Sequence, residues 1–183
     1  MRVEPMERIR LKRDVVCTMV PSGQKVLASK DTPVELMQAL GGSFTIKARG
    51  HLLRVEGKDA DALGKEPPPQ PKLPENASDK EVEEMVWEQL RGVFDPEIPI
   101  NIVDLGLVYK VEVESLPVSG RRVEVDMTLT APGCGMGGVI ASDAHQRIME
   151  IPTVEEAAVE LVFDPPWSKE MMSEEARLAT GMF

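Results

Sequence analysis

The chain has 183 residues, of which 42% are hydrophobic and 28% charged, enough for one medium domain or two small ones. Its formal net charge is −10 and is unevenly divided: residues 1–66 hold 12 basic and 9 acidic side chains, whereas residues 67–183 hold 9 and 22. The acidic second part argues against nucleic acid and against an anionic membrane surface as partners.

The sequence also lacks the patterns of secretion and membrane insertion. The N-terminus has charges but no apolar stretch of signal-peptide length, and no apolar run reaches the ~18 residues of a membrane span. The two cysteines, Cys17 and Cys134, lie in different parts of the chain, which disfavours a disulfide framework and fits a reducing compartment. We therefore expect a cytoplasmic protein.

Short segments rich in branched side chains dominate the first 60 residues. They predict strands over residues 15–20, 25–28, 43–49 and 51–56. Between them, the sequence Thr-Pro-Val-Glu at residues 32–35 matches a capping box with proline at the first helical position. It predicts a helix of about two turns that ends at Gly41 and Gly42.

A proline-rich stretch separates this region from the rest of the chain. Five of the eight residues 67–74 are proline, which favours extended polyproline geometry and a semi-rigid spacer. The predicted organisation is therefore a small strand-rich N-terminal domain over residues 1–66, a proline-rich linker over residues 67–77, and a C-terminal domain over residues 78–183.

The C-terminal domain is expected to begin with a helix followed by a hairpin. Ser78 and Glu81 form a second capping-box pattern. The apolar residues after it recur at helical spacing: Val82, Met85, Val86, Leu90, Val93 and Phe94. Alternating apolar residues then predict strands over residues 107–113 and 123–129, joined by a turn at residues 117–120.

The remaining elements are a helix, a strand and a short helix. Apolar residues at helical spacing, with Pro152 as the stop, are Val139, Ile140, Ala144 and Ile148. A third alternating strand covers residues 157–163, and Ser173 caps a last helix that Gly181 closes. Because a strand, a helix and a further strand imply a crossover, we expect a small mixed sheet in an α+β domain of order helix-strand-strand-helix-strand-helix.

The segment between the second strand and the following helix is the strongest functional candidate. It reads TLTAPGCGMGG over residues 128–138 and contains Cys134. Its glycines allow a tight turn with backbone N–H groups facing inward, and the start of the helix adds partial positive charge. Both effects favour the thiolate, so we expect the pKa of Cys134 to lie below the free value of about 8.5. The alternative is a small, buried and inert side chain.

Four motifs in order connect this segment to a known family. They are DPEIP at residues 95–99, IVDLGLVY at 102–109, MTLTAPGCGM at 127–136 and VFDPPWSKEMMSEEARL at 162–178. Together they resemble the iron-sulfur cluster assembly domain shared by SufT, PaaD and the cytosolic iron-sulfur targeting subunit of eukaryotes. Many relatives have proline after the cysteine, where this chain has Gly135; this variant, with the N-terminal extension, looks most like SufT. The resemblance implies a role in iron-sulfur cluster assembly, with Cys134 as its key residue.

The number of cysteines limits how a cluster could be held. A conventional cluster takes four thiolates, whereas this segment offers Cys134 alone and the chain has no C-x-x-C. We therefore expect an iron-sulfur cluster that is bound transiently, with further ligands from a second subunit in a homodimer, from a client protein or from other groups. Structural zinc is disfavoured, because a close set of Cys and His is absent from the sequence.

Several neighbouring residues are candidates for supporting the site. They are Asp95, Glu97, Asp104, Thr128, Thr130, Gly133 and Gly135. The carboxylates are candidate ligands or part of a client-docking surface. The two threonines, expected on the polar face of the strand that enters the loop, are candidates for orienting the loop by hydrogen bonds. Asp95 and Asp104 are equally well explained as turn and cap residues.

The hypothesis we favour is that the protein is a non-enzymatic accessory factor in the maturation of iron-sulfur proteins. Its expected partners are the assembly machinery and apo client proteins, without nucleic acid or membrane. One alternative is a cysteine-dependent enzyme, but His145, the histidine nearest in sequence, would lie about 13 Å or more along the helix from Cys134. The other alternative is an interaction adaptor that does not bind iron.

Overall fold

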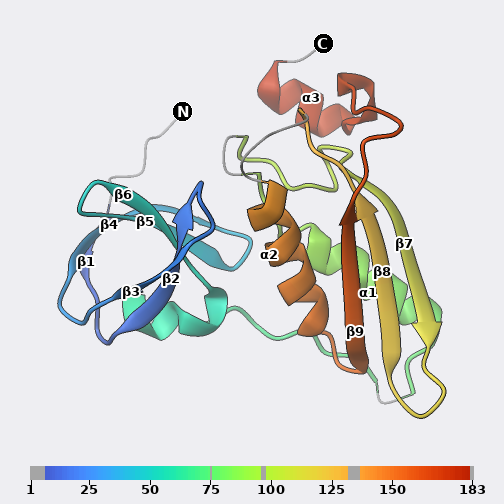
Figure 1. Ribbon diagram of the computed structural model, residues 1–183, viewed down its shortest axis with the longest axis horizontal. Coiled ribbons are helices and arrows are strands. Elements are labelled where there is room, and N and C mark those ends of the chain that lie inside the picture. Colours follow the sequence, from blue (N-terminus) through green and yellow to red (C-terminus); the bar gives the residue numbers. More distant parts are fainter. Residues whose placement is uncertain (1–6, 75, 96–97, 132–136, 182–183) are drawn as a thin grey trace. The chain divides into compact units, whose positions relative to one another are not determined.

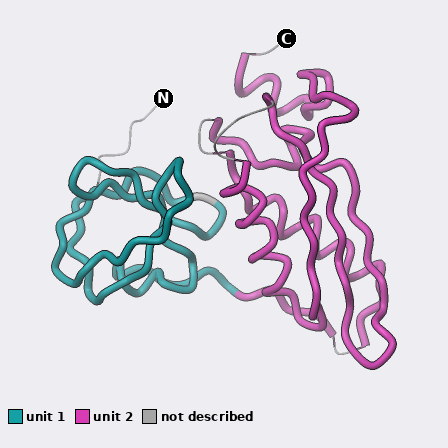
Figure 2. The backbone as a smooth tube through the Cα atoms, viewed as in Figure 1, with its two compact units in different colours: residues 1–69 teal, residues 70–183 magenta. Residues whose placement is uncertain are grey.

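The computed structural model describes residues 7–74, 76–95, 98–131 and 137–181. The chain forms two compact units, Met1–Pro69 and Gln70–Phe183 (Figure 2). The α+β class is confirmed, with a strand-rich N-terminal region and a mixed three-stranded sheet with helices in the C-terminal region. Among the described residues, no helix combines the length and the apolar character that a membrane crossing requires.

The first unit is a six-stranded antiparallel sheet with the strand order β1-β4-β5-β6-β2-β3 (Figure 1). The strands are β1 (Glu7–Arg10), β2 (Val15–Val20), β3 (Lys25–Ala28), β4 (Pro33–Leu40), β5 (Ser43–Ala48) and β6 (His51–Val55). One face of the sheet supplies the core, which includes Val15, Ile46 and Val55. A 3₁₀ helix, Gly57–Leu63, adds three buried side chains to that core.

The helix predicted from residue 32 to the glycines at 41 and 42 is wrong, because these residues form strand β4. β4 pairs with β1 on one side and with β5 on the other. Val34 is buried, and the register shifts at Met37 between Leu36 and Gln38, as at a β-bulge. Hydrogen bonds to two neighbouring strands thus override the local preference of a capping box. The four strands predicted from branched residues are confirmed.

The second unit combines a three-stranded sheet with helices. Its elements are α1 (Asp79–Leu90), β7 (Val108–Ser115), β8 (Arg121–Met127), α2 (Gly137–Met149), β9 (Val154–Leu161) and α3 (Glu174–Thr180), with a 3₁₀ turn at Lys169–Met171. β8 is central, antiparallel to β7 and parallel to β9, so the sheet is mixed as expected. α1 packs on β7, α2 packs on β9, and the two helices contact each other, so both cover the same face of the sheet (Figure 1).

Local capping signals define the start of α1 and both ends of α3 as predicted. The backbone N–H of Glu81 donates to Ser78 Oγ at 3.3 Å, and the N–H of Ser78 donates to Glu81 Oε2 at 2.7 Å. Ser173 caps α3 and Gly181 ends it with a left-handed φ of 69°. The four apolar residues predicted to face the core from α2 are buried. The predicted extension of the third strand to residue 163 is wrong, because β9 ends at Leu161 and Phe163 is 47% exposed.

Arg121, at the start of β8, ties three parts of this unit together. Its guanidinium donates to Asp79 Oδ1 at 2.8 Å, to Thr153 Oγ1 at 2.9 Å and to the carbonyl oxygen of Ala77. The side chain is only 14% exposed. The bonds from Arg121, followed by one from Ser115, hold the pKa of Asp79 below its usual value.

The depressed pKa of Asp79 predicts a pH dependence of stability. A carboxyl whose pKa is lower in the folded than in the unfolded chain contributes stability above about pH 4, and loses it as the pH falls through the folded pKa. Asp79→Asn is therefore expected to lower the free energy of unfolding at pH 7 and to make its decline below pH 4 shallower. Urea unfolding of both proteins from pH 7 to pH 3 measures this, and parallel curves would contradict it.

Candidate functional site

Three segments of the second unit meet at one end of its sheet. The backbone N–H of Thr128, just after β8, donates to the carbonyl oxygen of Leu107 at 2.7 Å. The N–H of Val162, just after β9, donates to the carbonyl oxygen of Met127 at 2.8 Å. The start of β7 and the ends of β8 and β9 therefore lie side by side. From this end the chain continues to Ala131 and is described again at Gly137, where α2 begins.

Four of the predicted site residues lie outside the described residues: Glu97, Gly133, Cys134 and Gly135. The structure does place both flanks of residues 132–136. Leu129 is buried on one flank, and Gly137 is buried on the other. A Cβ at Gly137 would come within 2.5 Å of Leu129 Cδ1, so the first turn of α2 packs closely on the chain just after β8 that leads into the segment. The two flanks are thus in direct contact.

The two predicted threonines differ in their surroundings. Thr128 is 1% exposed and lies between Met127 and Leu129, which are also buried, so it does not lie on a polar face. Thr130, two residues further on, is half-buried. The alternation of the strand has ended here, and the backbone bond from Thr128 to Leu107 holds this segment against the start of β7.

Asp95 and Asp104 each make hydrogen bonds within a tight turn of the connection between α1 and β7. Asp95 is buried, and its Oδ1 accepts from the backbone N–H of Ile98 at 3.0 Å. Asp104 Oδ2 accepts from Asn101 Nδ2 at 2.6 Å, while its backbone N–H donates to Asn101 Oδ1 at 2.9 Å. Both carboxylates therefore stabilise turns, the alternative that the sequence left open for them.

A segment that the sequence did not connect with the site lies across the same end. Trp167 Nε1 donates to the carbonyl oxygen of Leu105 at 2.8 Å, and the hydroxyl of Tyr109 donates to the carbonyl oxygen of Pro165 at 2.8 Å. The backbone N–H of Ser173 donates to the carbonyl oxygen of Asp104 at 2.8 Å. These bonds fix the chain from residue 165 to residue 173 onto the start of β7.

Gly106 makes that contact sterically feasible. Its φ is 70°, and a Cβ built there would overlap the backbone of Met171. A side chain is thus excluded both by the left-handed backbone and by the neighbouring chain. The glycine in the motif IVDLGLVY was visible in the sequence, but its partner, 65 positions later, was not.

Two alternatives for the site were a catalytic histidine and a structural metal ion, and the described residues bear on both. His145 lies on the exposed side of α2, eight residues after Gly137, as expected for a surface position. In the ranges that the structure describes, no three His, Cys, Asp or Glu side chains are close enough together to hold a metal ion. The described part of the site therefore consists of hydrogen-bonded turns and packed side chains in the segments beside residues 132–136.

The environment of Cys17 differs from the environment expected for Cys134. It is fully buried in the first unit, and burial raises the pKa of its thiol to about 11. At pH 8 about one Cys17 thiol in a thousand is then ionised. We predict that native alkylation with iodoacetamide at pH 8 modifies one thiol per chain quickly and Cys17 far more slowly. Peptide mass mapping identifies the fast site, and equal rates for both cysteines would contradict the prediction.

Comparisons with known proteins agree with the motifs of the second unit. Residues 83–161 match the family model described as iron-sulfur cluster assembly protein. The chain is 43% identical over 101 residues to a Porphyromonas gingivalis protein named Fe-S protein maturation auxiliary factor, covering 55% of this chain and 92% of the relative. It is 47% identical over 90 residues to the Staphylococcus aureus Fe-S protein maturation auxiliary factor SufT, covering 49% and 98%.

A solved structure is also similar to this chain. The crystal structure of a domain of unknown function from Bacillus anthracis is 38% identical, covers 57% of this chain and 96% of its own, and superimposes with a TM-score of 0.50. The family match lies within the second unit and leaves the first unit outside it. On these sequence matches, the chain belongs to the iron-sulfur cluster assembly protein family and is SufT-like.

Proposed function

We propose that this protein is an accessory factor in the maturation of iron-sulfur proteins, and that Cys134 binds a cluster transiently and passes it to an apo client. The observation that carries the proposal is the match to maturation auxiliary factors over 92% and 98% of their lengths. The family match at residues 83–161 spans Cys134 and both flanks of its segment.

The number of available thiolates indicates that the cluster is bound transiently, as cargo for delivery. Four thiolates hold a conventional cluster, and the segment at 132–136 offers one. Cys17 is a poor donor, because it is buried in the core of the other unit and its pKa is raised to about 11. The remaining ligands would come from a second copy in a homodimer, from a client or from other groups. A cluster held in this incomplete way leaves easily, as delivery requires.

The residues around the segment would position the thiolate. The contact between Leu129 and Gly137 supports a fixed distance between the two flanks. We assign Thr128 and Thr130 to orienting the segment, and Gly133 and Gly135 to its tight turn. Asp95 and Asp104 would shape the neighbouring connection through their turn hydrogen bonds, with Glu97 beside them in sequence.

The wider role follows from this chemistry. We propose a non-enzymatic factor that acts in the cytoplasm with the assembly machinery and with apo clients. The position of His145 eight residues after the start of α2, about 12 Å along the helix axis, supports this, since a cysteine nucleophile needs its base within hydrogen-bond reach. We also propose that the proline-rich stretch separates two domains, of which the second handles the cluster.

Complementation tests the proposal in cells. In a bacterial strain that lacks its own SufT-like factor, the wild-type chain should restore the activity of an iron-sulfur enzyme. Cys134→Ser should restore less than a tenth of that activity, because serine cannot replace the thiolate. Cys17→Ser is the matched control and should restore it fully. Full restoration by Cys134→Ser would contradict the proposed role.

A further inference from the structure

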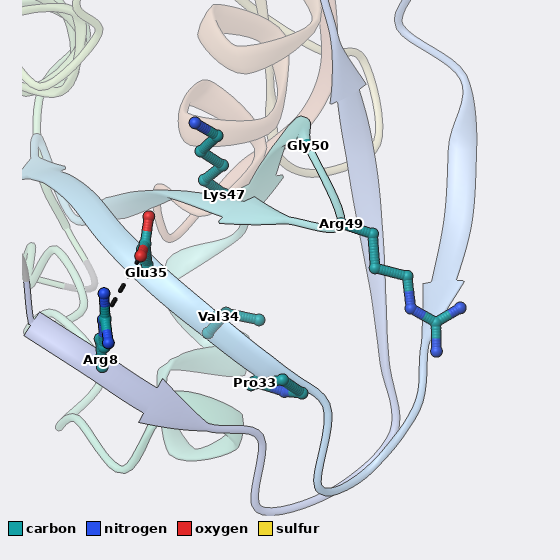
Figure 3. A pocket seen from close by; sticks show the side chains of 7 residues that line it. All are labelled: Arg8, Pro33, Val34, Glu35, Lys47, Arg49 and Gly50. Carbon is teal, nitrogen blue, oxygen red and sulfur yellow. Dashed lines mark ion pairs between the residues drawn. The ribbon is translucent and has the colours of Figure 1, made fainter.

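The first unit has a pocket lined by three cationic side chains. Its volume is about 370 Å³, and it lies beside β1, β4 and the turn between β5 and β6 (Figure 3). The cationic residues are Arg8, Lys47 and Arg49, and Glu35 is the one carboxylate that lines it among the residues the structure describes. The other lining residues are Pro33, Val34 and Gly50. We call this site the basic pocket.

Strand register places three of the charged residues in one row. Arg8 pairs with Glu35 across β1 and β4, and Glu35 pairs with Lys47 across β4 and β5. Arg8 Nε lies 3.4 Å from Glu35 Oε1, and Figure 3 marks this ion pair with a dashed line, so one cation is partly neutralised. Lys47 and Arg49 are exposed, and within the described part of the chain neither forms an ion pair. The pocket therefore has an excess of positive charge.

Arg49 occupies a backbone position that does not favour arginine. Its φ is 49° and that of Gly50 is 84°, so both central residues of the β5–β6 turn are left-handed. Asn, Asp and Gly are preferred in such turns, and other side chains there are strained. Arg49 points away from Glu35 in Figure 3 and has no ion pair among the described residues. Folding of this unit therefore gives no reason for arginine at this position, whereas binding an anion does.

We propose that the basic pocket binds an acidic peptide segment of a partner protein, with Lys47 and Arg49 pairing with two of its carboxylates. The charge of the pocket is complementary to such a segment. Nucleic acid fits less well, because among the described residues no aromatic side chain lines the pocket for base stacking. This site lies in the first unit and does not depend on the function proposed for Cys134.

Fluorescence anisotropy of a labelled hexaglutamate peptide tests the proposal on the full chain. Lys47→Ala and Arg49→Asn are each expected to weaken binding roughly two- to fivefold, the range of a solvent-exposed ion pair. Glu35→Gln should strengthen binding, because it removes a repulsive carboxylate and releases Arg8. Lys30→Ala, an exposed lysine outside the pocket, and Cys134→Ser should bind as the wild type does.

Stability measurements separate binding from folding. Arg49→Asn should melt at the same temperature as the wild type or higher, since asparagine tolerates the left-handed turn. Lower affinity in a variant of equal or greater stability then assigns a binding role to Arg49. No binding of the peptide at 50 mM salt, unchanged affinity in both pocket variants, or tighter binding of a hexanucleotide would each overturn the proposal.

Discussion

Gly106→Ala is expected to lower the free energy of unfolding of the second unit by about 2–5 kcal/mol. A left-handed backbone costs an alanine about 1–2 kcal/mol, and forcing a methyl group into packed structure costs about 1–3 kcal/mol. Both penalties apply, because Gly106 has a φ of 70° and its missing Cβ would overlap the backbone of Met171. The neighbour cannot move aside as a flexible side chain would, since Trp167 and Ser173 hold that segment by hydrogen bonds.

Gly138→Ala provides the matched control for this substitution. A Cβ at Gly138 meets nothing within 4 Å, and the residue lies in the first turn of α2. Alanine there should leave the stability unchanged or raise it by up to about 1 kcal/mol. Urea unfolding followed by tryptophan fluorescence compares the variants. A Gly106→Ala protein as stable as the Gly138→Ala protein would show that Gly106 does not hold the two segments together.

Any cluster that this protein holds is expected to be shared and labile. One thiolate per chain at the site leaves three conventional ligands to be found elsewhere. Native mass spectrometry without oxygen should therefore find the cluster on a dimer or on a complex with a client. Dilution or an excess of apo acceptor should remove more than nine-tenths of it, because shared binding depends on the concentration of the partner.

The opposite behaviour would point to a different mechanism. A monomer that keeps one full cluster in the presence of a chelator would contradict transient binding. The matched control is Cys17→Ser, which should share and lose the cluster as the wild type does, since Cys17 is buried in the other unit.

The sequence predicted those features of the fold that depend on neighbours along the chain. The capping box at Ser78 and the closure of α3 at Gly181 involve residues within four positions of each other, so the pattern alone defines them. β4 has a capping-box pattern as well, but its structure depends on β1 and β5. Its pairing with β1 joins residues more than 20 positions apart, and no local propensity reports that contact.

In the candidate site, too, the features set by neighbouring residues could be predicted, whereas the contacts between distant residues could not. Cys134 was singled out by its glycines, its place between a strand and a helix, and the family motifs, all of which are local. The bond from Trp167 to Leu105 and the fit of Gly106 against Met171 join residues more than 60 positions apart. The basic pocket was not predicted either, because its charged row exists only once β4 is a strand between β1 and β5.

Anaerobic reconstitution with iron and sulfide, followed by absorption and Mössbauer spectra, tests directly whether Cys134 binds an iron-sulfur cluster. The wild type and Cys17→Ser should gain cluster absorption and the matching iron signal, and both should transfer the cluster to an apo acceptor. Cys134→Ser should gain neither while remaining folded. Equal cluster content in Cys134→Ser, or no iron bound by the wild type while Cys134 is still required in cells, would contradict a cluster carried on this thiolate.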